Sequence, residues 1–392
     1  MAESILWGSE LSPFYLKVHA MLDHAGVEHR SLPGEGGRLE NIRAAARIRQ
    51  AKRRKTVLRF GGSDSLDEYP AVPFLIDADR HVHYDSTALA AWIDETHPPA
   101  DGPLVPEDAA VEFVARFIDE AFDEFGLYIV HHNRWVLSAG RNDAGDRFAA
   151  ELTRMFPPFM AGAISRRVAA RQTRRLPYLF SVAHDDLEQD LPDDLRAPTR
   201  DGFPPTHALL DEAWFALLDA MEQILGDQPF LLGGRFTLAD ASAYGQLSMN
   251  LTDAPAASVL HERAPRTFAW LAAIRDGAYT HASGELVVSD VLDPLLLTIG
   301  QTFVPLMQQN ERAFVDATAR GESLFNETGF NRGSALYDGS IAGHPYRHVV
   351  KSFQVRTWRD LRSRWQALTL DQQTALSRQF AVFGTAFSQE AP

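Results

Sequence analysis

The sequence predicts an α/β domain followed by an all-helical region. Near the N-terminus a short apolar run, an amphipathic helical segment and a second apolar run follow one another, which is the order of a βαβ unit. Residues 98–103 (Pro-Pro-Ala-Asp-Gly-Pro) have the composition of a linker. Beyond residue 105, apolar residues recur at helical spacing. A chain of 392 residues has room for two to three domains, each with its own core.

The first strand–helix–strand unit is defined by local signals. Residues 4–8 (Ser-Ile-Leu-Trp-Gly) have the composition of a short buried strand. Ser12 and Pro13 precede an amphipathic helix at 14–24, and a proline at the first helical position costs no hydrogen bond. Residues 27–32 form a second apolar run, so a right-handed βαβ unit with parallel strands is expected.

The rest of the α/β domain contains a long connection and a hairpin. A basic helix, a strand, its returning strand and a last helix are expected at 38–55, 71–77, 81–84 and 87–96. Pro73 lies near the start of its strand and removes a hydrogen-bond donor from the ladder, which indicates a sheet edge or a special backbone geometry. Ser86 is a good N-cap for the helix that follows it.

The second half of the chain is predicted to be helical. Helices are expected near 111–129, 145–183, 206–225, 237–251, 264–276, 290–319 and 346–386. Thr237 and Asp240 have the spacing of a capping box, in which each side chain satisfies a backbone donor of the other residue. A Gly-rich loop at 321–343 is expected to separate the last two helices.

Composition excludes several classes of function. There are no cysteines, which excludes disulfides, thiolate metal sites and cysteine nucleophiles. The net charge of -14 argues against nucleic acid as the main partner. No window has the ~18 apolar residues of a membrane span, and no signal peptide is recognisable, so a cytoplasmic location is expected. His344 and His348 have helical i,i+4 spacing but lack a third ligand, and no metal site is predicted.

Basic residues are concentrated in the long connection. Between Arg38 and Arg59 there are nine Lys or Arg residues and a single acid, Glu40. Such a run is more often a solvated face than a site. The alternative is a local site for an anionic ligand in an otherwise acidic protein.

Three patterns in this order resemble the glutathione S-transferase family, over residues 4–275. They are Ser12-Pro13-Phe14-Tyr15-Leu16-Lys17-Val18, Val72-Pro73-Phe74-Leu75 with Asp85-Ser86, and Phe230-Leu231-Leu232-Gly233-Gly234-Arg235-Phe236-Thr237-Leu238-Ala239-Asp240. The resemblance is to serine-type members, and to a longer bacterial subgroup with an Arg-Trp pair (Arg134-Trp135) and a C-terminal extension. It implies a thioredoxin-like glutathione-binding domain at 1–99 with an insertion at about 34–68, a helical substrate domain at 105–284 and a helical extension at 285–392.

The resemblance implies that Ser12 activates the glutathione thiol. Lowering a thiol pKa of ~8.5 by about two units needs about 2.7 kcal/mol. A hydroxyl donor and a helix N-terminus are both available at Ser12 to supply much of that energy. The alternative is that Ser12 only caps the helix. Tyr15 lies one turn later and is a secondary candidate, although packing against the helical domain is the simpler reading of that residue.

The resemblance also implies a binding site for the rest of the tripeptide. Val72-Pro73 resembles the family's cis-proline element, whose backbone pairs with the cysteinyl part of glutathione. Asp85-Ser86 resembles the acidic-Ser pair that holds the γ-glutamyl group, although Asp85 is shorter than the usual Glu or Gln, and Ser86 as a mere N-cap is the alternative. Arg53, or a neighbouring basic residue, is a candidate for the glycine carboxylate. The insertion could instead cover the pocket and exclude glutathione.

Two functions remain open. The first is a glutathione-dependent transferase, isomerase or lyase in which the thiolate attacks a small apolar electrophile. Its pocket would lie between the domains and be lined by Phe14, Tyr15, Phe122, Phe125, Tyr128 and His132. The second is a fold-sharing binding or assembly protein without turnover. A homodimer is expected from the resemblance, unless the C-terminal extension blocks the interface.

Overall fold

The first domain is built on a five-stranded sheet with the strand order β2-β1-β4-β5-β3. The computed structural model describes residues 3–62, 65–66, 72–280 and 282–387. The strands are β1 (Ser4–Trp7), β2 (His29–Leu32), β3 (Val57–Leu58), β4 (Phe74–Ile76) and β5 (Val82–His83). β1 is parallel to β2 and β3 to β5, whereas β4 is antiparallel to both β1 and β5. The predicted βαβ unit and the hairpin are therefore both present.

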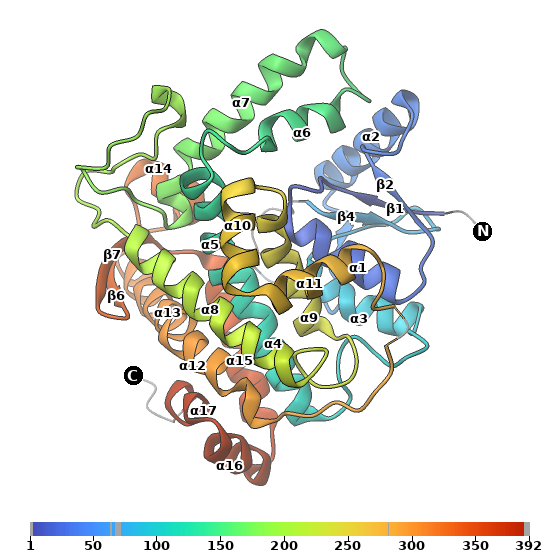
Figure 1. Cartoon of the computed structure of the whole chain (residues 1–392), viewed down its shortest axis with the longest axis vertical. Coiled ribbons are helices and arrows are strands. Elements are labelled where there is room, and N and C mark those ends of the chain that lie inside the picture. The colour runs from blue at the N-terminus through green and yellow to red at the C-terminus, as the bar shows by residue number, and fades with distance from the viewer. Residues whose placement is uncertain (1–2, 63–64, 67–71, 281, 388–392) are drawn as a thin grey trace.

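Helices cover both faces of this sheet (Figure 1). They are α1 (Pro13–His24), α2 (Arg38–Arg54) and α3 (Ser86–Thr96). Successive side chains of a strand point to opposite faces. Accordingly, Ile5 packs in one cluster with Ile48 of α2. Its neighbour Leu6 belongs to the large cluster that includes Val18 of α1 and Leu89 of α3.

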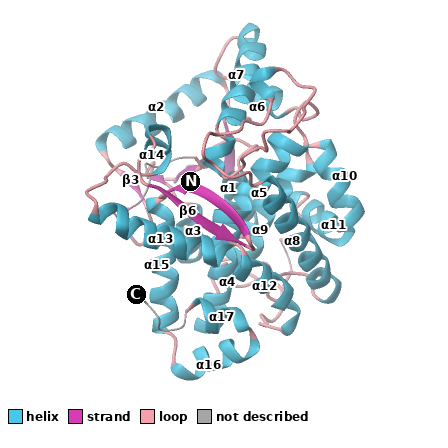
Figure 2. Ribbon diagram, turned by 90° about the vertical axis from the view of Figure 1, so that its left-hand side faces the viewer, coloured by secondary structure: helices cyan, strands magenta, loops and turns pink. Residues whose placement is uncertain are grey.

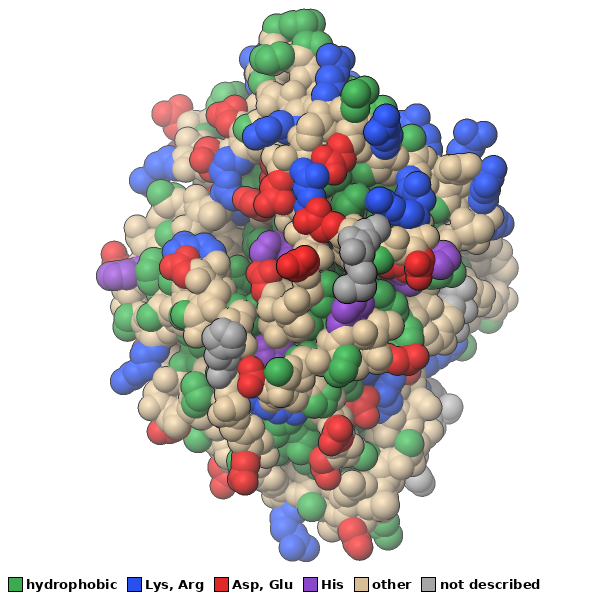
Figure 3. Space-filling model, turned by 90° about the vertical axis from the view of Figure 1, so that its right-hand side faces the viewer, with side chains coloured by type: hydrophobic (Ala, Val, Ile, Leu, Met, Phe, Trp, Pro, Cys, Tyr) green, Lys and Arg blue, Asp and Glu red, His purple; other side chains and the backbone are tan. Residues whose placement is uncertain are grey.

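The basic helix α2 therefore forms a layer of the first domain. Helix α2 buries Ala44, Ile48 and Ala51 against the sheet and leaves its basic side chains outside. Figure 3 shows Lys and Arg side chains concentrated in the upper part of the face it displays, at the height at which α2 and α7 lie in Figure 1. The predicted basic helix is present, and its apolar stripe explains why it packs.

Helix α3 begins differently from the prediction. Asp85, rather than Ser86, is the N-cap: its Oδ1 accepts a hydrogen bond from the Ala88 backbone N–H at 3.1 Å. Ser86 is already helical and is buried. An Asp–Ser pair offers two good capping side chains in succession, so the local sequence does not decide between them.

The second domain is helical. Its helices are α4 (Ala109–Ala121), α5 (Leu127–His132), α6 (Ala144–Leu152), α7 (Ala161–Arg174), α8 (His207–Asp227), α9 (Leu238–Leu247), α10 (Ala254–Arg263) and α11 (Pro265–Arg275). Two π-helical segments, Phe122–Gly126 and Asn133–Leu137, continue α4 and α5 as one long helix. The predicted capping box of Thr237 and Asp240 is confirmed. Among the described residues, no helix is long and apolar enough to cross a bilayer.

In this domain one helix prediction is wrong in detail and one helix was missed. The helix expected at 145–183 is divided into α6 and α7, because Pro157 and Pro158 lie between them and proline cannot continue a helix. Helix α10 was not predicted. Pro265 begins α11, which corresponds to the helix expected at 264–276.

A buried ionic cluster joins the two domains. Lys17 of α1 is fully buried, and its Nζ lies 2.5 Å from Asp119 Oδ1 and 2.6 Å from Asp123 Oδ2, both on the long helix. Thr87 of α3 accepts a third hydrogen bond from Lys17 at 3.0 Å. Gly245 of α9 allows α1 to approach closely, since a Cβ there would lie 2.6 Å from the Pro13 carbonyl oxygen.

The C-terminal extension folds back onto the helical domain (Figures 1 and 2). It contains α12 (Asp293–Gln301), α13 (Phe303–Ala319), α14 (Asn326–Arg332), β6 (Leu336–Ile341), β7 (His344–Val349), α15 (Ser352–Ala367), α16 (Leu370–Gln379) and α17 (Ala381–Ala386). Phe113 of α4 stacks against Trp365 of α15 and Phe383 of α17, with ring centroids 5.1 and 5.5 Å apart. The extension and the helical domain thus share one core.

The Gly-rich loop prediction is wrong. Residues 321–343 contain α14 and strand β6, and β6 pairs with β7 in an antiparallel hairpin. Ala342 and Gly343 form its turn with φ of 48° and 83°, the positive values that a two-residue hairpin turn requires. His344 and His348 therefore lie on a strand, and the helix expected from residue 346 begins at Ser352.

Candidate active site

The sheet topology brings the predicted site segments to one end of the first domain. Strands β1, β2, β3 and β5 all run in the same direction, and β4 runs against them. Five segments therefore meet at this end of the sheet. Four of them follow β1, β2, β3 and β5, and the fifth precedes β4. They contain Ser12, Pro33, Arg59, Asp85 and Pro73. Helices α1 and α3 both begin here, so two positive helix ends converge on the same place.

Ser12 is the N-cap of α1. Its Oγ accepts a long hydrogen bond from the Tyr15 backbone N–H at 3.4 Å, and the residue is half-buried. A serine hydroxyl has two acceptor lone pairs and one donor proton. Capping uses one lone pair only. The O–H of Ser12 is consequently still available as a donor at the open end of the sheet.

Two residues of the helical domain hold the loop that presents Ser12. Arg134 donates from Nη1 to the Leu11 carbonyl at 3.4 Å, while its Nε contacts Asp253 Oδ2 at 2.7 Å. Glu151 of α6 accepts from the Glu10 backbone N–H at 3.2 Å. Burial, together with the nearby Glu10, raises the pKa of Glu151 to about 7. Of these two residues, only Arg134 was noted in the sequence, as part of the Arg-Trp pair.

Tyr15 lies inside the first domain. Only 3% of it is exposed, and its ring packs so close to Gly8 that a Cβ at that glycine would lie 2.5 Å from the ring. Burial raises the pKa of its hydroxyl well above the ordinary value, although a hydrogen bond with Ser31 opposes the shift. Tyr15 is therefore a core residue that packs against Gly8 of its own domain, and its role as a secondary thiol donor stays a prediction.

The proline-led strand has the geometry that the resemblance implies. The Val72-Pro73 peptide bond is cis. Pro73 is buried and is followed by Phe74, which pairs with Trp7 at the end of β1. Val72 is 44% exposed, so this residue is open to a ligand at the end of the sheet.

Asp85 has a strained backbone and two cationic partners. Its φ is +74°, a conformation that residues other than glycine seldom adopt and that is often found at functional sites. Arg59 Nε lies 2.5 Å from Asp85 Oδ2, and Arg356 Nη2 lies 3.6 Å from the same oxygen. Burial opposes ionisation, but the two guanidinium groups outweigh it and hold the pKa of Asp85 below its usual value.

The basic residue at this site differs from the predicted one. Arg53 is exposed on α2, on the far face of the sheet from α1 and α3, and lines a surface hollow with Arg49, Gln50 and Arg54. Arg59 directly follows β3 and reaches the site, and this position after a strand was a signal in the sequence. Arg356 lies 271 positions after Asp85 on a helix of the extension, and no local signal pointed to it.

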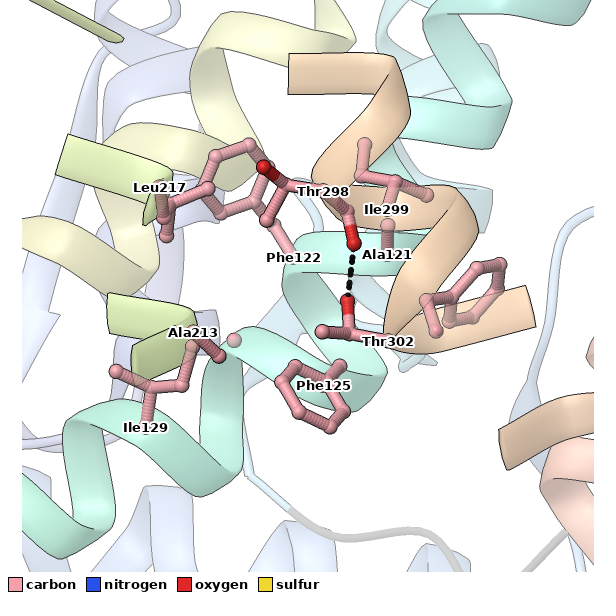
Figure 4. A pocket seen from close by; sticks show the side chains of 11 residues that line it. Ala121, Phe122, Phe125, Ile129, Ala213, Leu217, Thr298, Ile299 and Thr302 are labelled. Carbon is pink, nitrogen blue, oxygen red and sulfur yellow. Dashed lines mark hydrogen bonds between the residues drawn. The ribbon is translucent and has the colours of Figure 1, made fainter. Parts of the chain in front are cut away.

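The predicted substrate residues are divided between different surroundings. Phe14 is half-buried on the first turn of α1, beside Ser12. Phe122 and Phe125 line a small apolar cavity of about 20 Å³ with residues of α8 and α12, among them Leu217 and Ile299 (Figure 4). That volume holds one or two water molecules.

The other two predicted substrate residues are buried in polar networks. The Tyr128 hydroxyl accepts hydrogen bonds from Lys351 Nζ at 2.6 Å and Gln354 Nε2 at 3.0 Å. His132 contacts Ser181 Oγ at 2.9 Å and Asp211 Oδ1 at 3.3 Å. Phe122, Phe125, Tyr128 and His132 are each at most 3% exposed. Of the six residues predicted to line the pocket, the structure therefore places only Phe14 and Tyr15, both in the first turn of α1, beside Ser12.

One segment of the helical domain matches a known protein family. Residues 199–273 match the family model of the glutathione S-transferase C-terminal domain. No curated protein sequence matches the chain. Solved structures similar to this chain include a glutathione S-transferase from Rhodospirillum rubrum (16% identity, 75% of this chain, 91% of that chain, TM-score 0.36). Another is the β-etherase LigF of Sphingobium sp. (16% identity, 71% of this chain, 99% of that chain, TM-score 0.42). A third is a glutathione S-transferase from Methylobacillus flagellatus with glutathione bound (15% identity, 70% of this chain, 98% of that chain, TM-score 0.38).

Proposed function

We propose that this chain, which joins a glutathione S-transferase C-terminal domain to a thioredoxin-like domain, is a glutathione-dependent transferase, isomerase or lyase. The observation that carries the proposal is the meeting of Ser12, cis-Pro73 and Asp85 at one end of the sheet. A cap hydroxyl, an exposed strand end and a second helix N-terminus form a complementary surface for an anionic thiol peptide.

The proposed role of Ser12 is to stabilise the thiolate. Its O–H donates to the sulfur while a lone pair keeps the Tyr15 N–H, and the N-terminus of α1 adds a favourable dipole. A hydrogen bond to a charged group is worth about 1.5–3 kcal/mol. Loss of that bond would lower the acid dissociation constant of the bound thiol roughly tenfold to hundredfold. The thiolate then attacks an electrophilic carbon of an apolar substrate beside Phe14.

The proposal is tested with the Ser12→Ala variant. Glutathione binding is measured by calorimetry, and ionisation of the bound thiol by its ultraviolet absorbance as a function of pH. We expect the variant to raise the pKa of the bound thiol by one to two units, from the energy above, and to slow conjugation of an activated aryl halide about 10- to 100-fold near neutral pH.

Two controls separate chemistry from folding. Ser12→Thr keeps the hydroxyl and should keep most of the activity. Thr369→Ala removes the N-cap of α16, at a cost of about 1 kcal/mol in stability, and should leave turnover unchanged. A wild-type chain that does not bind millimolar glutathione would instead support the alternative of a binding or assembly protein without turnover.

A further inference from the structure

The C-terminal extension reaches the proposed active site through Arg356. Helix α15 packs along α4, and Arg356 lies in its second turn. Its Nη2 approaches Asp85 Oδ2 at 3.6 Å, on the carboxylate oxygen that also contacts Arg59 Nε at 2.5 Å. Two guanidinium groups from segments almost 300 residues apart in the sequence thus meet at the N-cap of α3.

Acidic groups of α4 and the π-helical segment also feel the charge of Arg356. Glu120 and Glu124 are one helical turn apart, and burial raises the pKa of both, that of Glu124 to about 7. The positive charge of Arg356 acts against this shift in both residues. Gln354, also on α15, donates to Glu124 Oε2 at 3.0 Å. Arg356 therefore interacts electrostatically with carboxyl groups of both domains, Asp85 at the N-cap of α3 and Glu120 and Glu124 on the long helix.

This pairing of opposite charges matches one part of glutathione. The γ-glutamyl end carries an α-carboxylate and an α-ammonium group on the same carbon. A guanidinium group binds a carboxylate with two parallel hydrogen bonds, and a helix N-terminus adds backbone donors.

We propose that Arg356 binds the α-carboxylate of the γ-glutamyl group, so that the C-terminal extension completes the glutathione site. The inference rests on the proposed function. It predicts that a residue outside the matched transferase domain of residues 199–273 determines the affinity for the thiol peptide.

Calorimetry on the full chain tests the inference with two ligands. The first is glutathione, and the second is an analogue in which the γ-glutamyl α-carboxylate is replaced by hydrogen. We expect Arg356→Gln to weaken glutathione binding 10- to 100-fold. The wild type should bind the analogue more weakly than glutathione by a similar factor. Arg356→Gln should bind the two ligands with nearly equal affinity, because the partner of that carboxylate is already absent.

Matched variants guard against a folding effect. Arg359→Gln alters an exposed arginine of the same helix, which contacts Glu311 at 2.7 Å, and should bind glutathione like the wild type. Arg356→Lys keeps the charge and should fall between the wild type and Arg356→Gln. Wild-type affinity in Arg356→Gln, or an equal loss with the analogue in both proteins, would overturn the inference while leaving the proposed function standing. Absence of glutathione binding by the wild type would overturn both.

An independent observation points to a metal site on the first domain. His19 and Asp23 lie one turn apart on α1, and His29 begins β2. One ligand atom from each lies within 4.8 Å of the other two, and all three residues are half-buried. His19 Nδ1 is 2.9 Å from Asp23 Oδ2, and the two imidazole rings meet edge to face with centroids 5.0 Å apart.

The hydrogen bonding of His29 prepares it as a ligand. Its Nδ1 lies 2.9 Å from the Val27 carbonyl oxygen, so Nδ1 carries the proton and Nε2 presents its lone pair. Metal-bound histidines usually have such a backbone or carboxylate partner on the other nitrogen. Two imidazoles and one carboxylate are a ligand set for a divalent transition metal with an open position. The geometry points to a Zn²⁺ site that joins the end of α1 to β2.

Titration of Zn²⁺ into the tag-free, chelator-treated chain tests this assignment. We expect one site of micromolar affinity, weakened at least tenfold by His29→Ala and by Asp23→Asn. The control is His81→Ala, in a second His–Asp–His group whose two rings both contact Asp77, and it should bind like the wild type. Visible absorbance of Co²⁺ in place of Zn²⁺ reports the coordination directly. Equal Zn²⁺ affinity in the wild type and His29→Ala would overturn the assignment.

Discussion

At the scale of single residues, the main feature of this chain is a set of buried charged and polar side chains. Lys17 is enclosed by Asp119 and Asp123, and although burial disfavours its charge, the two carboxylates outweigh burial and raise its pKa. Burial in turn raises the pKa of Asp119 to about 6. A buried ion of this kind is tolerated only with its partners in place.

Lys17→Met is therefore expected to destabilise the protein by about 3–5 kcal/mol, because it leaves two buried carboxylates without a cation. Urea unfolding at pH 7 measures the loss. Lys55→Met, at an exposed position after α2, is the control and should change the free energy of unfolding by less than about 0.5 kcal/mol. Equal stability of the two variants would contradict the assigned role of Lys17.

His348 provides a prediction about pH. It is fully buried among aromatic rings, and among the described residues neither of its ring nitrogens has a hydrogen-bond partner. Burial, with Lys351 nearby, holds its pKa well below the ordinary value. The unfolded chain, with a histidine pKa of ~6.5, then binds a proton that the folded chain does not. The contribution of the neutral ring to the free energy of unfolding is fully present above pH ~6.5, and it is lost as the pH falls below this value.

His348→Phe should remove this contribution. We expect its free energy of unfolding to equal or exceed that of the wild type at pH 8, and the advantage to grow between pH 6.5 and pH 5. His81→Phe, at an exposed position, should show no such growth. Chemical denaturation at several pH values gives the comparison. A pH dependence of His348→Phe identical to that of the wild type would be inconsistent with a neutral buried ring.

At the scale of elements, the contact between α1 and α9 sets the relation of the two domains. Gly245 lies against Pro13 and Lys17, and an added Cβ would lie 2.6 Å from the Pro13 carbonyl oxygen and 2.9 Å from the Lys17 Cβ. The N-terminus of α1, where Ser12 lies, is thus in direct contact with the helical domain.

Gly245→Ala should force these helices apart and cost about 1–3 kcal/mol, as overpacking of a core does. Gly162 of α7 is the matched control, because its nearest atom is the end of a flexible arginine at 3.8 Å. Gly162→Ala should be neutral or stabilise the chain by up to about 1 kcal/mol. Thermal unfolding of both variants distinguishes crowding from the general effect of an alanine in a helix.

At the scale of the whole molecule, the extension and the helical domain form one cooperative body. Trp365 and Phe387 of the extension stack with centroids 5.3 Å apart, and both contact Phe113 of α4. A core shared in this way is expected to unfold in a single transition.

Trp365→Ala should consequently lower the stability of the entire chain by about 3–5 kcal/mol. Near-ultraviolet circular dichroism and intrinsic fluorescence should follow one common, shifted transition. An early, separate transition that leaves the rest of the chain at its original midpoint would show that the extension unfolds on its own.

Much of the first domain was predictable because its signals are local. Ser12-Pro13 marks a helix start, Val72-Pro73 marks a special strand end, and the apolar runs give the strands. The predicted site segments follow from topology alone, since parallel strands bring their ends together. One error was also local in origin: residues 346–349 of β7 were predicted as the start of a helix, because both conformations place residues four apart on one face.

Local patterns of residues were enough to predict the order of the two domains and the serine and prolines at the end of the sheet. The charged groups that gather there could be found only from the packing of the folded chain. Arg356 meets Asp85 because α15 packs along α4, and Phe122 and Phe125 turn toward α8 and α12 because the extension covers that side. Such contacts arise from the packing of distant segments, and no local pattern of residues encodes them.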